Sequence, residues 1–343
     1  MSENSLKRQK NTIILSFIVL YAIVFVLSFA VGRYPIKPLT LIKILLSKVF
    51  PIQMDWTRQA EVVVFNIRMP RLIAASLIGA SLSLSGLVFQ TIFRNPMVSP
   101  DVLGTTSGAG FGAALALLFN MPMAWVNISA FGFGLISLSA VYLVSSRVKG
   151  NQILGLILGG IMISSLFSSA TSFIKLVADP NDTLPNITYF LMGSLAGCTM
   201  NDIKFAIIPM AIGIITISAF AWRINLLSLS EEESRSLGVN TKALRIVLIS
   251  ASALLISSSV SIAGVIGWVG LVIPHIVRMS IGCDTRHTIP ASIFLGAAFL
   301  IAVDTFSRML STSEIPIGIL TSIIGAPFFL YLIIKQGRRE DAA

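Results

Sequence analysis

The amino-acid sequence predicts an all-α, polytopic membrane protein in which residues 1–343 form a single transmembrane domain. Hydrophobic residues make up 55% of the chain, charged residues make up 12%, and the mean hydropathy is +0.87, far from the composition of a soluble domain. About ten apolar segments recur, many of them near the roughly 20 residues that cross a bilayer. The net charge of +10 is scattered between these segments, without the dense basic runs of a nucleic-acid-binding surface. We therefore expect membrane lipid, and no nucleic acid, around this chain.

The first apolar segment follows Lys7, Arg8 and Lys10 and is longer than the core of a typical signal peptide. We therefore expect it to remain as an uncleaved first helix. Charged, Pro-rich and Gly-rich breaks separate the later segments. The predicted membrane spans are residues 11–31, 72–93, 103–119, 127–145, 152–174, 203–222, 243–263, 267–280, 289–310 and 317–335.

An even number of spans places both chain ends on one side of the membrane. With residues 1–10 in the cytoplasm, the cytoplasmic segments hold 15 of the 25 Lys and Arg residues, as the positive-inside rule requires. Seven of the others lie between Val31 and Arg71, on the outer side, where that rule does not explain them. The outer basic segment therefore needs a separate reason.

Two stretches, residues 95–104 and 264–274, place Pro and Gly inside or beside apolar sequence. Broken helices at membrane depth are tolerated only against protein or a water-filled path. The nearby hexapeptides Ser83–Val88 and Ser261–Ile266 resemble each other and run in opposite directions in the predicted topology. Matching interruptions in two oppositely directed halves are typical of an inverted repeat with a transport path at its interface.

The motifs of common catalytic sites are missing from the sequence. It contains no phosphate-binding loop, no His-Glu-x-x-His and no Gly-x-Ser-x-Gly, so we expect no catalytic residue and no ATP hydrolysis by this chain. Cys198 and Cys283 lack the spacing of a disulfide framework or a metal site, and His275 has no carboxylate or thiol at ligand spacing. The sequence predicts no metal site and no cofactor bound by this chain.

The longest polar interruption, about residues 225–242, lies on the cytoplasmic side. A capping box, acidic residues at the helix start and a glycine that can end the helix predict one or two helical turns. A solvated loop and a short surface helix that docks into a partner both fit this composition. The residues concerned are Ser230, Glu231, Glu232, Glu233, Arg235 and Gly238.

The fifth span is rich in hydroxyl side chains, several of which share a helix face at spacings of three and four. Small hydroxyl residues usually serve helix–helix packing in membranes, which is the favoured interpretation. The alternative is a mildly polar wall of a wide path for a bulky solute. The residues are Ser164, Ser165, Ser168, Ser169, Thr171 and Ser172.

Between about residues 60 and 335, several motifs follow one another in a fixed order. They resemble, in that order, the motifs of iron-siderophore, haem and cobalamin permeases of bacterial ABC importers, the FecCD-type transmembrane subunits. The motifs are Arg68-Met69-Pro70-Arg71, Gly79-Ala80, Gln90–Pro96, Val98–Gly104, Gly267–Arg278, Asp304–Arg308, Glu314–Gly318 and Gly325–Phe328.

The resemblance implies ten helices per subunit in the bacterial cytoplasmic membrane and a pair of permease subunits, here a homodimer, around a central pathway. It also implies two cytoplasmic ATPase subunits, which bind ATP and Mg, and an external substrate-binding protein. The family carries ferric siderophores, haem, cobalamin and occasionally oxyanions. Among these substrates, we expect a ferric siderophore because that class is the most numerous, with haem or cobalamin next.

The resemblance also assigns roles to individual residues. Arg68, Arg71 and Arg308 match arginines that receive glutamates of the binding protein, which would explain the outer basic segment. The spacing of Arg68 and Arg71 further predicts that the two converge on one carboxylate. Residues 230–241 match the coupling helices that sit in the ATPase cleft. At the cytoplasmic gate, Gly150 and Asn151 stand where some relatives carry hydroxyl residues, so the chain departs from the family pattern there.

A secondary transporter driven by an ion gradient would also show broken helices, but it should bury ionisable residues at mid-membrane. Within the predicted spans, the main charged candidates are Asp304 and Arg308, whose i,i+4 spacing lets them pair near the outer end. A membrane enzyme would need a cluster of His, Asp or Glu, and no such cluster is evident. The ABC importer interpretation is therefore preferred to both alternatives.

Overall fold

The computed structural model describes residues 3–32, 34–48, 50–51, 53–148, 152–229, 231–311 and 314–340, and no β-strand occurs in these ranges. The elements are α1 (Glu3–Ala30), α2 (Pro38–Leu46), α3 (Arg58–Val62), the π-helix η1 (Val63–Arg68), α4 (Met69–Ile92), the 3-10 helix η2 (Pro100–Leu103), α5 (Thr105–Leu118), α6 (Met123–Arg147), α7 (Gln152–Val177), α8 (Thr183–Leu191), α9 (Met200–Ala219), α10 (Ala221–Leu226), α11 (Glu231–Ser236), α12 (Thr241–Ala263), α13 (Val269–Ile281), α14 (Thr285–Leu310) and α15 (Ile317–Glu340).

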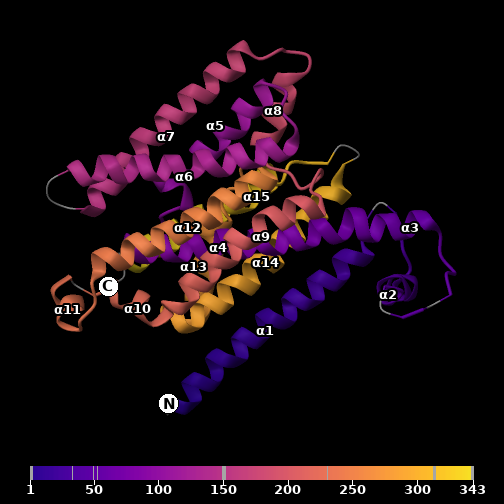
Figure 1. The fold of residues 1–343 in the computed structure, drawn as a ribbon. Coiled ribbons are helices and arrows are strands. Elements are labelled where there is room, and N and C mark those ends of the chain that lie inside the picture. Colours follow the sequence, from indigo (N-terminus) through magenta and orange to yellow (C-terminus); the bar gives the residue numbers. More distant parts are fainter. Residues whose placement is uncertain are drawn as a thin grey trace.

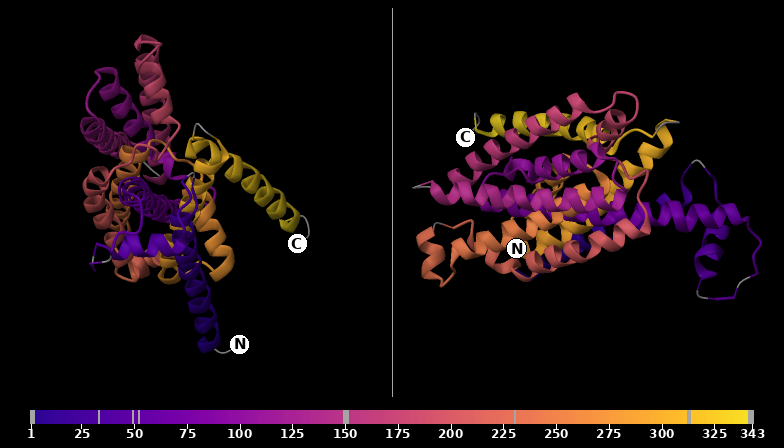
Figure 2. Two further views of the ribbon diagram at one scale, coloured as in Figure 1. Left: turned by 90° about the vertical axis from the view of Figure 1, so that its right-hand side faces the viewer. Right: turned by 45° about the horizontal axis from the view of Figure 1, so that its top comes forward.

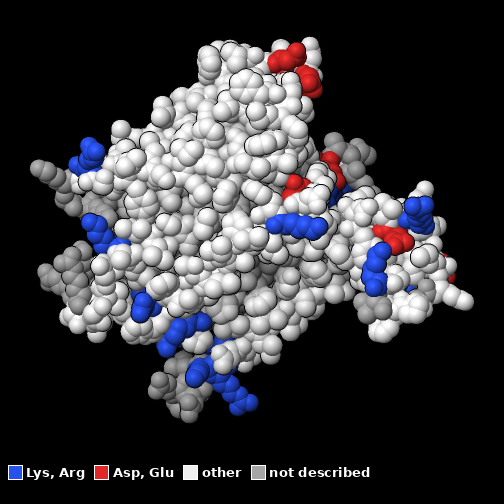
Figure 3. Space-filling view, in the orientation of Figure 1, with Lys and Arg blue, Asp and Glu red and all other residues white. Residues whose placement is uncertain are grey.

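Each predicted span overlaps one apolar helix, and the two chain ends lie at the same end of the bundle (Figures 1 and 2). In the face shown in Figure 3, basic residues gather at the end that carries the termini, and a broad uncharged band separates them from the opposite end. The all-α, multi-pass prediction is therefore confirmed. The described residues contain seven long apolar stretches and three shorter ones, namely Lys7–Ala30, Arg58–Ile92, Met123–Arg147, Ile153–Val177, Met200–Ala219, Thr241–Ala263, Thr285–Leu310, Thr105–Leu118, Val269–Ile281 and Ile317–Tyr331.

Helix α4 lies at the centre of the bundle and is buried over most of its length. Its small residues allow neighbouring backbones to approach closely, which is how helices pack in a membrane. A Cβ atom on Gly79 would lie 2.2 Å from the carbonyl oxygen of Gly296 in α14. A Cβ atom on Gly86 would lie 1.7 Å from the carbonyl oxygen of Gly270 in α13. Helices α13 and α14 therefore contact α4 through backbone atoms.

Both predicted interruptions are present. After α4, the chain turns through η2 and reaches Gly104 in the left-handed region, with φ of 73°. After α12, Gly264 and Trp268 have φ of 68° and 69°, and α13 begins at Val269. The second break is therefore shorter than residues 264–274, because Pro274 lies inside α13.

The two similar hexapeptides occupy different structural positions. Ser83–Val88 lies within the uninterrupted helix α4, whereas Ser261–Ile266 covers the end of α12 and the turn after it. The sequence likeness therefore does not mark two equivalent breaks.

Two short helices lie outside the predicted spans. Helix α2 runs across the direction of the spans at the outer end of α1, where Figure 1 shows it nearly end-on. It begins at Pro38 and buries Leu41 and Ile44. Helix α8 precedes α9 in the chain and lies towards the same end of the bundle as α2. Each has nine residues, so neither could be recognised by span length.

Candidate docking and coupling sites

A buried ionic cluster joins α4, α14 and the segment between α14 and α15 at the end of the bundle opposite the termini. Arg71 donates from Nη2 to Oδ1 of Asp304 at 2.6 Å, and from Nη1 to Oε1 and Oε2 of Glu314 at 2.9 and 2.8 Å. Arg71 is 3% exposed and Asp304 is fully buried, whereas the Glu314 side chain is 22% exposed. Glu314 is therefore the part of this cluster that reaches the surface.

Arg308 belongs to the same cluster. Its Nε lies 3.1 Å from Oδ2 of Asp304, as the i,i+4 spacing predicted, and its Nη2 donates to the hydroxyl of Ser28 at 2.8 Å. Ser28 lies near the end of α1, so Arg308 links α1 to α14. A buried charge is tolerated when it is paired, and each charge of this cluster has an ionic partner. Nε of Arg71 and Oδ2 of Asp304 have no hydrogen bond within the described residues.

Within this chain, Arg68 does not share a carboxylate with Arg71, and convergence of the two on a carboxylate of a partner stays a prediction. Its guanidinium donates to the backbone carbonyls of Phe29 and Tyr34, at and beyond the end of α1. The preceding turn is the π-helix η1, and Pro70 follows it. Arg68 and Met69 both have right-handed helical dihedrals, so the backbone relation of the two arginines is retained. Their long side chains diverge, that of Arg68 towards the end of α1 and that of Arg71 towards α14.

The outer basic segment is partly neutralised within the chain. Lys48 pairs with Glu61 at 3.2 Å and lies 5.0 Å from the ring centroid of Phe65, and Lys43 pairs with Asp55. Together with the buried arginines, these contacts give several outer cations partners in the same chain. Binding-protein docking at Arg68, Arg71 and Arg308 remains a prediction.

The short helix predicted near residues 225–242 is present as α11, at the end of the bundle that carries the termini. Gly238 has φ of +76°, and the N–H of Val239 donates to the carbonyl of Ser234 at 3.2 Å. This is the geometry of a Schellman motif, in which glycine adopts a left-handed conformation at little cost. The expected helix-ending role of Gly238 is confirmed. Ser230, and with it the predicted capping box, lies outside the described residues.

Helix α10, which precedes α11 in the chain, is tied to the start of α14. Asn225 donates from Nδ2 to Oδ1 of Asp284 at 2.9 Å, and its Oδ1 accepts from the N–H and the hydroxyl of Thr285 at 2.8 and 2.7 Å. Hydrogen bonds from Arg286 and Asn225 hold the pKa of Asp284 well below its usual range. None of these anchoring residues was singled out from the sequence, because their partners are about 60 residues apart.

The helix face of α7 that carries the serine hydroxyl groups is largely exposed in the isolated chain. Ser165, Ser168, Ser169 and Ser172 are exposed, and Ser164 is partly buried beside Gly104. The favoured packing interpretation therefore applies within this chain to Ser164 and not to the other four. Gly150 and Asn151, the predicted gate residues, lie outside the described residues.

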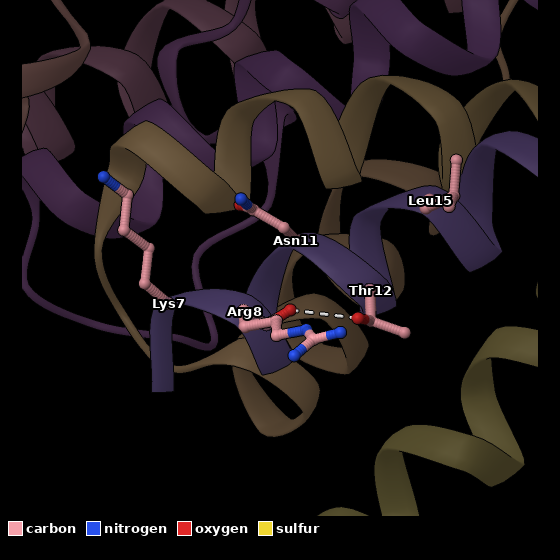
Figure 4. Close-up of a pocket in the computed structure, with 5 residues that line it drawn as sticks. All are labelled: Lys7, Arg8, Asn11, Thr12 and Leu15. Carbon is pink, nitrogen blue, oxygen red and sulfur yellow. Dashed lines mark hydrogen bonds between the residues drawn. The ribbon is translucent and has the colours of Figure 1, made fainter. Parts of the chain in front are cut away.

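The described cavities do not assemble a catalytic or metal site. A pocket of about 280 Å³ between α6, α8, α9 and α12 includes Cys198, Asn127 and Asp202. Burial raises the pKa of the Cys198 thiol to about 12. The hollow in Figure 4 lies on one face of α1, where Thr12 donates to the carbonyl of Arg8 at 3.0 Å. No group of three His, Cys, Asp or Glu residues suited to a metal ion occurs in the described part of the chain.

Comparison with known protein families decides the class. The sequence model of the FecCD transport family matches residues 20–335. The chain belongs to the FecCD transport family. This FecCD protein is 39% identical to the molybdate import system permease protein MolB of Haemophilus influenzae, over 95% of this chain and 96% of MolB. It is 36% identical to the hemin transport system permease protein HmuU of Yersinia pestis, over 80% and 84% of the two chains.

A solved structure supports the same assignment. A metal-chelate-type ABC transporter in an inward-facing conformation is 38% identical to this FecCD protein, with a TM-score of 0.85 and coverage of 95% and 99% of the two chains. With the ten apolar helices, these findings establish a multi-pass permease of the ABC importer class in the inner membrane. The family assignment also excludes the ion-gradient-driven secondary transporter as the alternative.

Proposed function

We propose that two copies of this FecCD permease enclose a pathway through which a metal chelate enters the cytoplasm, driven by ATP hydrolysis in two separate subunits. The open hydroxyl face of α7 carries this proposal. Four exposed serines near the middle of a membrane span are unusual on a lipid-facing surface, where apolar side chains are favoured. A second permease copy and a wetted pathway would account for them.

The first candidate substrate is a ferric siderophore or a similar metal chelate. A path lined by small hydroxyl groups and apolar side chains suits a bulky solute recognised elsewhere, by an external binding protein. Molybdate is the second candidate, because the relative MolB matches almost the whole chain. Uptake into proteoliposomes distinguishes the two, with radioactive iron presented as a siderophore and radioactive molybdenum as molybdate.

The ATPase contacts the permease at α11. Glu231, Glu232, Glu233 and Arg235 supply charges along this six-residue helix, and Gly238 ends it. Such a short helix on the cytoplasmic side fits a groove of a partner subunit. In this arrangement ATP and Mg bind only to the ATPase, and the permease itself binds no cofactor.

The binding protein docks at the outer end, where Arg68, Arg71 and Arg308 lie. Because Arg71 already binds Glu314, a glutamate of the binding protein would have to replace the partly exposed Glu314 side chain. Arg71→Glu and Arg308→Glu should therefore weaken docking in lipid nanodiscs, and wild-type docking should weaken at high salt. Unchanged affinity in folded variants would reject docking at these arginines.

The complete proposal is tested by co-expressing the permease with its cognate ATPase. We expect a complex with two copies of each subunit, which hydrolyses ATP and accumulates the chelate only when the loaded binding protein is present. ATP hydrolysis by the purified permease alone, or chelate uptake without the ATPase, would refute this division of labour.

A further inference from the structure

Arg94 ends α4 on the cytoplasmic side and has an uncommon backbone conformation. Its φ is 51°, in the left-handed region that residues other than Gly rarely adopt. The N–H of Asn95 donates to the carbonyl of Gln90 at 3.1 Å, which closes the helix end in the way a glycine usually does. The left-handed backbone conformation costs more free energy for an arginine than for a glycine, and contacts of the arginine side chain can offset that cost.

That side chain contacts the turn that leads into α11. Nε of Arg94 donates to the carbonyl oxygen of Leu227 at 3.0 Å, and Nη2 donates to the carbonyl oxygen of Leu229. The planar guanidinium thereby bridges two carbonyls that are two residues apart. A lysine could not reproduce this, because its ammonium is a single point of charge.

The bridged turn is also fastened to α11 itself. The hydroxyl of the fully buried Ser234, in α11, donates to the carbonyl of Leu226 at 2.7 Å. A displacement of α11 is therefore passed to the turn at residues 226–229, and from there through Arg94 to α4. Because α4 is buried against α12, α13 and α14, it cannot bend freely to absorb that displacement.

We propose that Arg94 is a positioning residue that joins the ATPase-contacting helix α11 to the central helix α4, so that movement of the ATPase reaches the transport path. The proposal rests on the proposed role of α11 in ATPase contact. The opposite end of α4 carries Arg71 of the outer cluster, so one buried helix connects the two proposed partner surfaces. The bond between Asn225 and Asp284 supplies a second, independent attachment to α14.

The test uses the assembled complex of permease and ATPase in proteoliposomes with the loaded binding protein. Arg94→Gly removes the guanidinium and also relieves the left-handed backbone, so it should preserve thermal stability while breaking the connection. We expect transport per ATP hydrolysed to fall about tenfold, the effect of losing one or two hydrogen bonds from a charged group. Arg94→Lys should lose transport to a similar degree. Arg223→Ala, which removes a nearby exposed cation stacked on Phe220, serves as the control and should transport normally.

The outcomes separate this inference from the proposed function. If the wild-type complex does not assemble or transport, the proposed function fails. If the wild type transports and Arg94→Gly transports equally well per ATP, the role of Arg94 is refuted while the function stands. Loss of the ATPase from the Arg94→Gly complex would assign Arg94 to assembly and would likewise overturn its role in coupling.

Discussion

Replacing Gly86 by alanine should destabilise the protein, although alanine is the better helix former. A Cβ atom at Gly86 would lie 1.7 Å from the carbonyl oxygen of Gly270 and 2.5 Å from its carbonyl carbon. Both atoms belong to the backbone of α13, so no side-chain rotation can relieve the contact. The helices must separate by roughly 1 Å or more before the methyl group fits, which is overpacking at a close backbone crossing.

The separation also weakens polar contacts at the same crossing. Nε2 of Gln90 donates to the carbonyls of Gly270 and Leu271, both at 3.3 Å, so these bonds have little length to spare. Overpacking costs about 1–3 kcal/mol and each lost hydrogen bond about 1 kcal/mol. The gain in helix propensity is about 0.5–1 kcal/mol, so with both hydrogen bonds lost the net destabilisation is about 2–4.5 kcal/mol.

Gly132 in α6 provides a matched control, because a Cβ atom there meets no atom within 4 Å. Thermal midpoints of Gly86→Ala and Gly132→Ala can be compared in one detergent by size-exclusion chromatography after heating. We expect a drop of about 4–15 °C for Gly86→Ala, since 1 kcal/mol corresponds to a few degrees at this size, and no drop for Gly132→Ala. Equal midpoints for both variants would refute the close-crossing argument.

Three further predictions concern the two ends of the bundle. Asp304→Asn leaves two buried guanidinium groups without their shared carboxylate, so it should cost about 3–5 kcal/mol, whereas Glu314→Gln at the partly exposed site should cost about 1 kcal/mol. Equal thermal midpoints would contradict this ranking. Gly238→Val should lower transport per ATP more than Gly238→Asn, because asparagine tolerates positive φ and a Cβ atom at this position meets no atom within 4 Å. Equal transport by the two variants would count against a backbone cause. Maleimide at pH 8 should label the exposed Cys283 and spare the buried Cys198. The raised pKa of Cys198, about 12, keeps its thiol protonated until the protein unfolds or the pH rises towards that value. Rapid labelling of Cys198 in the native protein would disprove its burial.

The membrane class and the number of spans could be predicted because they depend on local composition. An apolar run of membrane-spanning length must form a helix in lipid, whatever its neighbours are, since its backbone groups have no other partners. The helix end at Gly238 was equally predictable, because the Schellman turn depends on a few consecutive residues. Helices α2 and α8 were missed because nine residues cannot span a bilayer.

The roles of the arginines depended on tertiary structure. Arg68 and Arg71 are three residues apart, yet Arg71 binds carboxylates 233 and 243 residues away and Arg68 binds backbone carbonyls beyond α1. No local pattern specifies which of these partners each arginine reaches, because the choice follows from the packing of α1 and α14 on α4.

The sequence by itself therefore determined an α-helical inner-membrane permease of the FecCD family, because hydropathy and ordered motifs are properties of the chain. Tertiary structure alone decided which charges are buried, which serines stay open and that Arg94 reaches Leu227. The physical reason is the close approach of backbones at small residues such as Gly79 and Gly86. That packing brings distant side chains within hydrogen-bonding distance, and it exists only once the helices have assembled.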